Sequence, residues 1–211
     1  GRNLIRKLTK NNYKVIAVTR NIHQKGYILK TQANPGYLEI VELERLSEES
    51  IRELFKTCSI CINLIGILYE ESKNQFKKIH SKFPTLLSKI SKETNIDQFI
   101  HISALGVENA KDSAYAISKL EGEKGVRENF ENAVILKPSI VYSIDDNFTT
   151  NFMTLLSRLP LMPLFYNGET KFAPLHVSDL TEIIFQTISS EIKNETIECI
   201  GPEVLSFKDI L

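Results

Sequence analysis

Hydrophobic positions follow two alternating patterns along this chain. Short runs rich in β-branched residues, such as "YKVIAVTR" and "SICINLIG", have the length and composition of buried strands. Longer segments between them repeat apolar residues at the spacing of an amphipathic helix. We expect strands at 13–20, 37–43, 59–66, 98–104 and 132–142, and helices at 1–12, 47–56, 72–93 (interrupted by Pro84), 114–130, 148–158 and 178–190.

This regular alternation is typical of a parallel sheet whose crossover helices cover both faces. The predicted fold class is therefore α/β, with a doubly wound parallel sheet. The 211 residues fit a single domain, 1–211. The proline-bearing stretch 159–165 is the best candidate for a change of character, and we expect a small substrate-side region from about residue 150 onward.

Composition excludes some classes of function. Lys and Arg number 26 and Asp and Glu number 26, so the net charge of zero gives no electrostatic footprint for nucleic acid. No apolar run approaches the roughly 18 residues that a membrane span needs. Three cysteines provide no disulfide framework and suit a reducing compartment. We take the sequence as a fragment truncated at both ends, because it starts inside a helix without a methionine, and expect any targeting peptide to lie outside it.

The carboxyl ends of the strands are the places to search for a site, because doubly wound sheets bind ligands there. Thr19 and Arg20 end the strand at 13–20. Sites specific for NAD usually offer an acid at this point to the ribose 2′-hydroxyl, whereas an arginine suits a 2′-phosphate through its paired donors. For a sheet that binds a nicotinamide dinucleotide, as the resemblance described below implies, Arg20 favours NADPH over NADH. The alternative is that Arg20 is an ordinary surface residue.

A tyrosine and a lysine near the start of one helix are candidate catalytic residues. Tyr115 and Lys119 are four residues apart, so they share a helix face. A phenol is a poor acid or base near pH 7, and a neighbouring ammonium is expected to lower its pKa. The Ser103 hydroxyl, at the end of the preceding strand, is placed to hold a substrate carbonyl oxygen during hydride transfer. The same Tyr–Lys spacing also occurs on ordinary solvated helix surfaces.

Four segments together carry a family resemblance: "NLIG" (63–66), "HISALG" (101–106), "YAISK" (115–119) and "KPSIVY" (137–142). They resemble the short-chain dehydrogenase/reductase superfamily, in its atypical, extended branch. The resemblance implies a Rossmann-like fold. It also implies that Gly1 is the last glycine of the family's GxxGxxG phosphate loop, and that the first strand and the rest of that Gly-rich loop are missing from this fragment.

The resemblance assigns cofactor contacts to particular positions. Arg2 follows the phosphate loop and adds positive charge there. The backbone from Asn63 through Leu64, Ile65 and Gly66 is expected to pass beside the adenosine ribose and the pyrophosphate, since glycine permits close approach to a ligand. Glu42 and Leu43 stand where the family usually has an Asp and an apolar residue near the adenine. Tyr115 and Lys119 are expected at the nicotinamide ribose, bordered by Pro138, Ser139 and Ile140.

Within the superfamily, residues 101–152 are most similar to the nucleotide-binding accessory subunits of respiratory complex I (NADH:ubiquinone oxidoreductase) and to their bacterial relatives, which are like NAD-dependent epimerases and dehydratases. Tyr115 follows Ser103 by only 12 residues, a shorter spacing than sugar-nucleotide epimerases generally have. The resemblance implies an accessory or assembly protein that holds NADPH structurally. It further implies complex I subunits as partners and a cytoplasmic or mitochondrial-matrix location, peripheral to the inner membrane.

A second hypothesis stays open, because Ser103, Tyr115 and Lys119 are all present. Under it, the protein is an active NADP-dependent oxidoreductase or sugar-nucleotide epimerase/dehydratase. We expect no metal site: Cys58 and Cys61 have CxxC spacing, but no second pair or nearby histidine completes a zinc site.

Other polar residues have simpler interpretations. His101 and His176 are expected to be packing or hydrogen-bonding residues. Lys73, Lys77 and Lys78 are expected on a solvated helix face that could also contact a partner.

Overall fold

The computed structural model describes residues 1–42, 47–144, 154 and 165–210. Its strands are β1 (Val15–Thr19), β2 (Leu38–Glu42), β3 (Ile60–Asn63), β4 (Gln98–Ile102), β5 (Val134–Pro138), β6 (Val141–Tyr142), β7 (Lys171–Phe172), β8 (Leu175–His176), β9 (Thr196–Cys199) and β10 (Leu205–Ser206). Its α-helices are α1 (Arg2–Lys10), α2 (Ile22–Lys30), α3 (Glu48–Phe55), α4 (Phe83–Glu93), α5 (Ala114–Asn129), α7 (Val177–Ser189) and α8 (Phe207–Ile210). A π-helix, η2 (Lys77–Lys82), and two 3₁₀-helices, η3 (Val107–Asn109) and η4 (Phe165–Gly168), complete the set.

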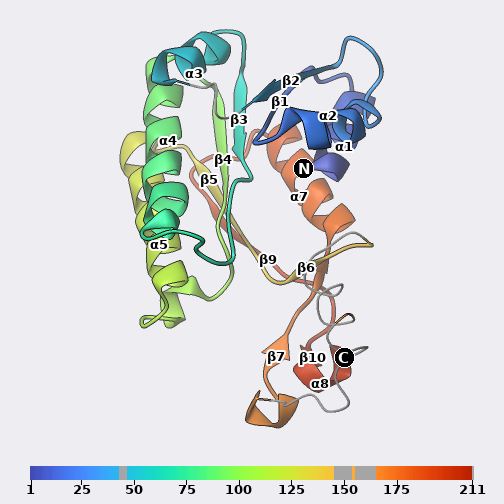
Figure 1. Cartoon of the computed structure of the whole chain (residues 1–211), viewed down its shortest axis with the longest axis vertical. Coiled ribbons are helices and arrows are strands. Elements are labelled where there is room, and N and C mark those ends of the chain that lie inside the picture. Colours follow the sequence, from blue (N-terminus) through green and yellow to red (C-terminus); the bar gives the residue numbers. More distant parts are fainter. Residues whose placement is uncertain (43–46, 145–153, 155–164, 211) are drawn as a thin grey trace.

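Parallel strands form the centre of the molecule (Figure 1). β3, β4, β5 and β9 make one sheet in that order, and β1 and β2 make a second parallel pair. The predicted α/β class with a parallel sheet is therefore confirmed. Within the described ranges, no hydrogen-bond ladder joins β1 to β3. The additional first strand that the resemblance implied stays a prediction.

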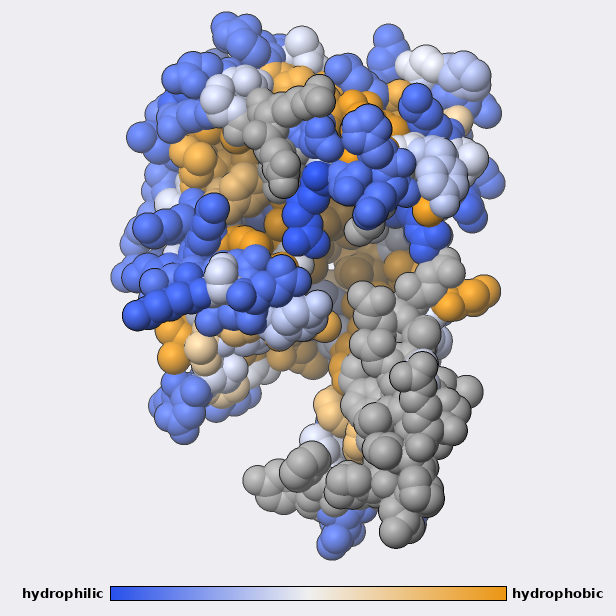
Figure 2. All heavy atoms as spheres, in the orientation of Figure 1, coloured by the Kyte–Doolittle hydropathy of each residue, from blue (hydrophilic) through white to orange (hydrophobic). Residues whose placement is uncertain are grey.

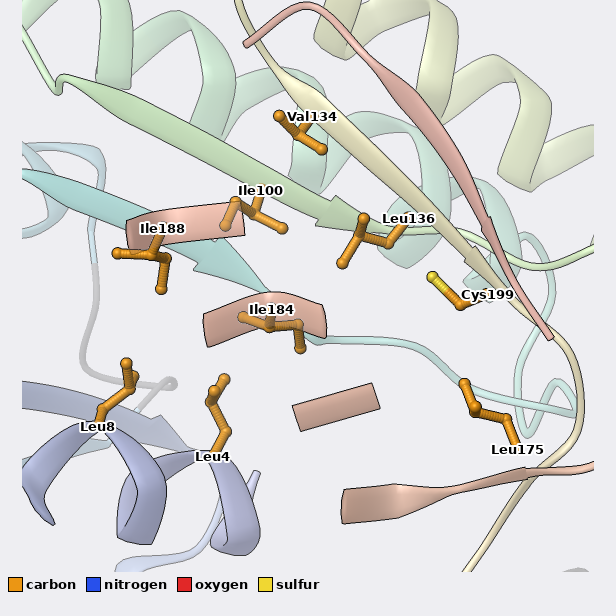
Figure 3. Packing of buried hydrophobic residues seen from close by; sticks show 9 residues of the cluster. All are labelled: Leu4, Leu8, Ile100, Val134, Leu136, Leu175, Ile184, Ile188 and Cys199. Atoms are coloured by element: carbon orange, nitrogen blue, oxygen red, sulfur yellow. The ribbon is translucent and has the colours of Figure 1, made fainter. Parts of the chain in front are cut away.

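Two hydrophobic clusters, one on each face, attach helices to the larger sheet. On one face, Leu4 and Leu8 of α1 and Ile184 and Ile188 of α7 pack with the sheet residues Ile100, Val134 and Leu136 (Figure 3). On the other face, residues of α3, α4 and α5 pack together with Phe99 of β4, and they include Ile51, Leu87, Ile90 and Val126. Strand residues 99 and 100 thus point to opposite faces, as the period of a strand requires. Helices cover both faces, which defines the doubly wound arrangement.

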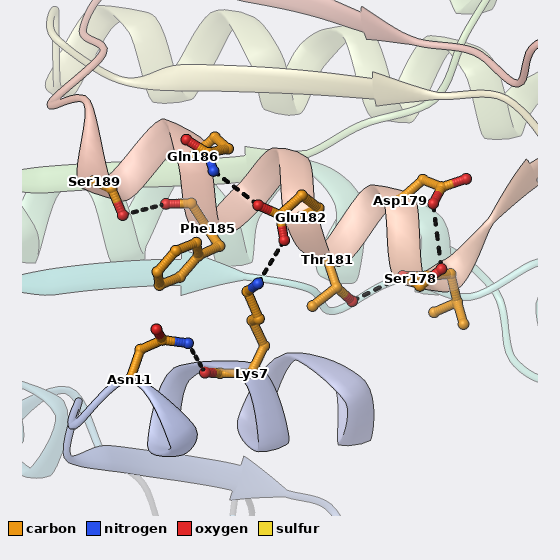
Figure 4. A network of polar contacts seen from close by, with 10 residues as sticks. Lys7, Asn11, Ser178, Asp179, Thr181, Glu182, Phe185, Gln186 and Ser189 are labelled. Carbon is orange, nitrogen blue, oxygen red and sulfur yellow. Dashed lines mark hydrogen bonds and ion pairs between the residues drawn. The ribbon is translucent and has the colours of Figure 1, made fainter.

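The contact between α1 and α7 joins the start of the chain to its late helix (Figure 4). Lys7 Nζ lies 2.6 Å from a carboxylate oxygen of Glu182 and 4.7 Å from the centre of the Phe185 ring. Both charged side chains are partly exposed, so the ion pair contributes little to stability. Burial of Leu4 and Leu8 is the stronger attachment, because burying a leucine contributes about 2 kcal/mol.

Helix starts follow local sequence signals. Ser47, Ser113 and Asn21 each accept a hydrogen bond from a backbone N–H in the first turn of α3, α5 and α2, respectively. Pro84 lies in the first turn of α4, where the π-helix η2 passes directly into α4, so the predicted interruption is a change of helix type.

Elements that were not predicted from the sequence include α2, β9 and the two-residue strands β7, β8 and β10. The helix predicted at 148–158 lies outside the described residues except for Thr154, as does most of the stretch 159–165. In the portion of the chain that the structure describes, no helix has the length and apolar character to cross a membrane.

Candidate functional site

The candidate site lies where β3, β4 and β5 end, beside η2 and the start of α5. Asn63, Ser103 and Pro138 mark these strand ends. Figure 2 shows a hollow, with hydrophobic residues at its floor, between the part of the molecule built by η2, α4 and α5 and the part built by β1, β2 and α2. This is the position that a doubly wound sheet offers to a ligand.

Lys119 is held at the end of β4 by both burial and hydrogen bonding. Its side chain is 5% exposed, and Nζ donates to the backbone oxygen of Ile102 at 3.2 Å. Nζ also lies 5.9 Å from the centre of the Tyr115 ring, so the two predicted residues do share one face. Burial lowers the pKa of Lys119 to about 8, although the nearby Glu123 carboxylate opposes that shift. Lys119 is therefore a buried cation that loses its proton close to physiological pH.

Tyr115 does not have the lowered pKa that the sequence led us to expect. Its side chain is partly buried, and burial raises the pKa of the phenol above its ordinary value of 10.0. The prediction was wrong in direction because desolvation of the phenolate outweighs the attraction of an ammonium several ångströms away. In this arrangement the phenol stays protonated at neutral pH, so its O–H is available to donate a hydrogen bond to a ligand.

Ser103 is engaged by a neighbouring carboxylate, and the convergence of Ser103, Tyr115 and Lys119 beside a dinucleotide stays a prediction. The Ser103 side chain is 4% exposed, and its hydroxyl donates to the carboxylate of Glu123. The other oxygen of Glu123 lies 3.2 Å from Lys137 Nζ, which lies 3.3 Å from the Glu108 carboxylate. A charged acceptor thus occupies the hydroxyl that was expected to hold a substrate carbonyl. Burial lowers the pKa of Lys137, but the carboxylates of Glu123 and Glu108 outweigh burial and raise it overall.

The loop after β3 brings the backbone close to Lys119. Asn63 shapes this loop: its side-chain oxygen accepts from the Ile65 N–H at 3.1 Å, and its side-chain nitrogen lies 3.1 Å from His101 Nδ1. A Cβ atom built on Gly66 would lie 3.4 Å from Lys119 Nζ. Leu64 and Gly66 are exposed. Gly66 and Lys119, both assigned to the cofactor site from the sequence, thus lie close together, and their contact with a dinucleotide stays a prediction.

His80 belongs to the same cluster and was missed in the sequence. Its side chain is 1% exposed; Nε2 accepts from the Ile67 N–H at 3.0 Å, and Nδ1 lies 3.0 Å from the Ser118 hydroxyl. The ring stacks on Phe76 and meets Tyr115 edge-on. Burial and, secondarily, the charge of Lys119 lower the pKa of His80 to about 4, so the imidazole is neutral. The feature that sets His80 apart is the π-helix that carries it. Hydrophobic periodicity in the sequence does not reveal a π-helix, so no signal for His80 was available in the sequence.

His101 is a hydrogen-bonding core residue, as its position inside a strand led us to expect. Nδ1 contacts the Asn63 side chain, while Nε2 is buried without a hydrogen-bond partner among the described residues. Burial, then the charges of Lys119 and His80, lower the pKa of His101 to about 3. It remains neutral beneath the site.

The predicted adenine-side residues lie at the ends of β1 and β2. Thr19 ends β1 directly opposite Glu42 of β2, and Arg20 follows it with an exposed side chain. Glu42 accepts from the Ile22 N–H at 3.2 Å, so its carboxylate supports the start of α2. Leu43 lies outside the described residues.

The remaining residues that were predicted to contact the cofactor lie at the start of α1 and at the end of β5. Gly1 caps α1, and Arg2 is the first residue of that helix. The backbone oxygen of Pro138 accepts from Leu105, the N–H of Ser139 donates to Cys199, and the oxygen of Ile140 accepts from Leu175. These bonds fix the loop that was expected to border the nicotinamide.

The surroundings of Cys58, Cys61 and His176 indicate structural roles for these residues. Burial raises the pKa of Cys58, and it raises that of Cys61 to about 12, so neither is a ready thiolate. Among the described residues, no group of His, Cys, Asp and Glu side chains has the arrangement of a metal site. His176 Nδ1 accepts from the Ser178 N–H and caps α7.

Comparison with known proteins agrees with the resemblance inferred from the sequence. A family model described as the NAD dependent epimerase/dehydratase family matches residues 1–199. The mouse (Mus musculus) protein named NADH dehydrogenase (ubiquinone) 1 alpha subcomplex subunit 9, mitochondrial, is 29% identical over 177 residues, which are 82% of this chain and 46% of the relative. Its namesake in Dictyostelium discoideum is 27% identical over 212 residues, covering 100% of this chain and 59% of the relative. The chain thus spans about half the length of these relatives.

Two other matches come from enzymes. A Caulobacter vibrioides protein named ceramide reductase is 23% identical over 85% of this chain and 54% of the relative. Among solved structures, UDP-glucuronic acid 4-epimerase from Bacillus cereus, in complex with UDP-glucuronic acid and NAD, superposes with a TM-score of 0.80 at 22% identity, over 99% of this chain and 76% of the epimerase chain. At this identity the superposition establishes the shared fold.

Proposed function

Because this chain belongs to the NAD-dependent epimerase/dehydratase family, we propose that it is the dinucleotide-binding part of an accessory or assembly subunit of respiratory complex I. In this role it holds a nicotinamide dinucleotide as a structural element and does not turn it over. Membership of a family defined by NAD dependence supports dinucleotide binding. The relatives named as mitochondrial subunits of NADH dehydrogenase (ubiquinone) support the assembly role and a mitochondrial location. Within the mitochondrion, we propose a location on the matrix face of the inner membrane.

One contact carries the non-catalytic part of the proposal: the Ser103 hydroxyl donates to Glu123. Hydride transfer to a carbonyl needs a donor that holds the carbonyl oxygen beside the proton-donating phenol. Freeing Ser103 for that purpose would leave a buried carboxylate with one fewer donor, which costs about 1–3 kcal/mol. Burial also raises the pKa of the Tyr115 phenol, which makes it a weaker acid than a solvated tyrosine.

The same cluster retains what dinucleotide binding needs. Lys119 presents a buried ammonium and Tyr115 a protonated phenol. Gly66 presents exposed backbone beside Lys119. Together these groups suit the hydroxyls of a ribose, which accept hydrogen bonds from an ammonium and a phenol. The expected contacts of Pro138, Ser139 and Ile140 lie at the neighbouring strand end.

We assign NADPH as the preferred dinucleotide. Thr19 and Arg20 end β1 without an acid at either position, and the exposed Arg20 guanidinium is the group that suits a 2′-phosphate. The carboxylate of Glu42, in the neighbouring strand, is held by the start of α2.

An active reductase is the second candidate function. Two observations favour it: Tyr115 and Lys119 share one face within 5.9 Å, and one relative is named ceramide reductase. Under this alternative the substrate carbonyl displaces Glu123 from Ser103. A sugar-nucleotide epimerase reaction is the related possibility, to which the fold alone lends support.

Two substitutions separate these functions. Tyr115→Phe removes the phenol oxygen and keeps the ring, whereas Lys119→Ala removes the ammonium. If the protein only holds the dinucleotide, Lys119→Ala weakens NADPH affinity by about tenfold or more, since it deletes a charge-assisted hydrogen bond. No carbonyl substrate is then reduced by the wild type. Matched controls are Tyr27→Phe and Lys124→Ala, whose side chains are exposed.

The measurements are NADPH titration of the full-length protein and an assay of NADPH oxidation with ceramide-like ketones and UDP-sugars. Turnover by the wild type that is abolished by Tyr115→Phe, with NADPH affinity retained, would contradict the structural role and establish the enzyme.

A further inference from the structure

We propose that His80 is a positioning residue of the dinucleotide site, which ties the loop after β3 to the helix that carries Tyr115 and Lys119. This inference rests on the proposed function and adds to it. The distance between Gly66 and Lys119 depends on how the loop after β3 is held relative to helix α5. His80 contacts both elements, and it comes from a third one, the π-helix η2.

The first step is the direction of the hydrogen bonds. The Ile67 N–H donates to His80 Nε2, so that nitrogen carries no proton. A neutral imidazole must then carry its proton on Nδ1, which donates to the Ser118 hydroxyl. Ser118 in turn donates to the backbone oxygen of Tyr115 at 2.7 Å. One directed chain of hydrogen bonds therefore runs from the loop at Ile67 through His80 to the first turn of α5.

The second step is the position of Gly66 within this chain. A Cβ atom on Gly66 would lie 3.4 Å from Lys119 Nζ and 3.7 Å from His80 Nε2. The hydrogen bond from the Ile67 N–H to His80 therefore fixes the loop one residue away from Gly66, where the loop approaches Lys119. A shift of this loop changes the space available to a ribose between Gly66 and Lys119.

The third step is how tightly His80 itself is fixed. Its backbone oxygen would lie 1.8 Å from a Cβ atom on Gly122, so η2 contacts α5 at a point where only glycine fits. Its ring contacts the rings of Phe76 and Tyr115, which also contact each other. A π-helix is a costly local structure that is frequently found at functional sites. The fold therefore places this imidazole with little freedom, as a positioning role requires.

Two substitutions at His80 test the tie. His80→Phe keeps a ring of similar size and removes both polar atoms, whereas His80→Gln keeps an acceptor and a donor on a side chain of similar reach. We expect His80→Phe to weaken NADPH affinity about tenfold, the effect of losing one well-placed polar interaction. We expect His80→Gln to restore affinity to within about threefold of wild type. His23→Phe, at an exposed histidine of α2, is the matched control and should bind like wild type.

Two readouts are needed in the full-length protein: NADPH affinity by titration, and hydrogen exchange of the peptide that contains Ile67, in the free protein. His80→Phe should accelerate exchange at Ile67, and His80→Gln should not. Exchange and affinity unchanged in His80→Phe, or affinity in His80→Gln as poor as in His80→Phe, would overturn the inference. If His80→Phe does not fold, Ser118→Ala replaces it, with the same expected directions for affinity and a severalfold smaller loss.

Failure of the inference is distinguishable from failure of the proposed function. Wild-type protein that binds no dinucleotide refutes the proposed function, and it overturns with it the claim that His80 positions a dinucleotide site. Wild-type protein that binds NADPH, with His80→Phe binding equally well, refutes only the role of His80.

Discussion

Replacing Gly122 with alanine tests the close contact between η2 and α5 on which the geometry of the site depends. The added Cβ atom would lie 1.8 Å from the backbone oxygen of His80, whereas ordinary contacts begin at 3.4 Å. The neighbouring atom belongs to the backbone, so no side-chain rotation relieves the overlap. Either η2 or α5 must move by more than an ångström.

Two opposing effects set the magnitude. Alanine is about 1 kcal/mol better than glycine in a helix interior, which would stabilise the variant. Overpacking costs about 1–3 kcal/mol in typical cores and more where the backbone must shift. Since this overlap is with backbone, we expect a net loss of about 2 kcal/mol or more, which lowers the Tm by about 4–8 °C for a protein of this size. NADPH affinity should fall as well, because His80 moves with η2.

Gly125, one turn further along α5, provides a matched comparison. A Cβ atom there would lie 2.0 Å from Oγ1 of Thr85, a side-chain atom. Gly125→Ala alone should therefore also destabilise the protein, but Thr85→Ala should recover most of that loss in a double-mutant cycle. Urea denaturation and thermal unfolding measure the stability of wild type, Gly122→Ala, Gly125→Ala, Thr85→Ala and the Gly125→Ala/Thr85→Ala double variant. Gly122→Ala as stable as wild type, or more so, would refute the close approach of η2 to α5.

Three further predictions concern charged side chains. Compared with Lys119→Met, the dinucleotide-free protein should gain on the order of 3 kcal/mol in its free energy of unfolding between pH 8 and 10.5. The gain arises because the folded state releases the Lys119 proton near pH 8, whereas the unfolded chain keeps it up to the ordinary pKa of lysine. If urea denaturation gave the same difference between the two proteins at every pH, the burial of this ammonium would be contradicted. Lys137→Met should destabilise the protein by about 3–5 kcal/mol by leaving the Glu123 carboxylate buried without its cation, and Glu123→Met in the same chain should recover much of the loss; equal stability of Lys137→Met and wild type in chemical denaturation would count against the network. Arg20→Ala should weaken NADPH affinity about tenfold or more and NADH affinity little; equal loss of both in parallel titrations would refute the assignment of NADPH.

Much of the fold followed from patterns that are local in the chain. The strand at 98–104 and the helix at 114–130 were predicted within a few residues of β4 and α5, because burial and capping signals are written into those segments. β9 was missed because "TIEC" is too short and too polar to resemble a buried strand. Its strand structure comes from parallel pairing with β5, which the local sequence does not reveal. α2 was missed because its apolar residues do not form a clear stripe and Gly26 interrupts it.

The site was predicted in its positions and only partly in its contacts. Chain topology brings Gly66 and Lys119 together, since Gly66 follows the carboxyl end of β3 and Lys119 extends from α5 to the carboxyl end of the neighbouring β4. The direction of the Ser103 hydroxyl depends on which acceptor lies nearest after packing, and Glu123 is that acceptor. Glu123 is four residues beyond Lys119 on the same helix face, so a carboxylate near the predicted trio was a signal available in the sequence.

The most direct test of the account is the nucleotide content of the full-length protein after gentle purification. The account predicts about one NADPH per chain, released only on unfolding, in protein that migrates with complex I, because the proposed role requires a bound dinucleotide and an assembled partner. Protein that is recovered free of complex I and empty of nucleotide, and that stays empty when NADPH is supplied, would contradict it.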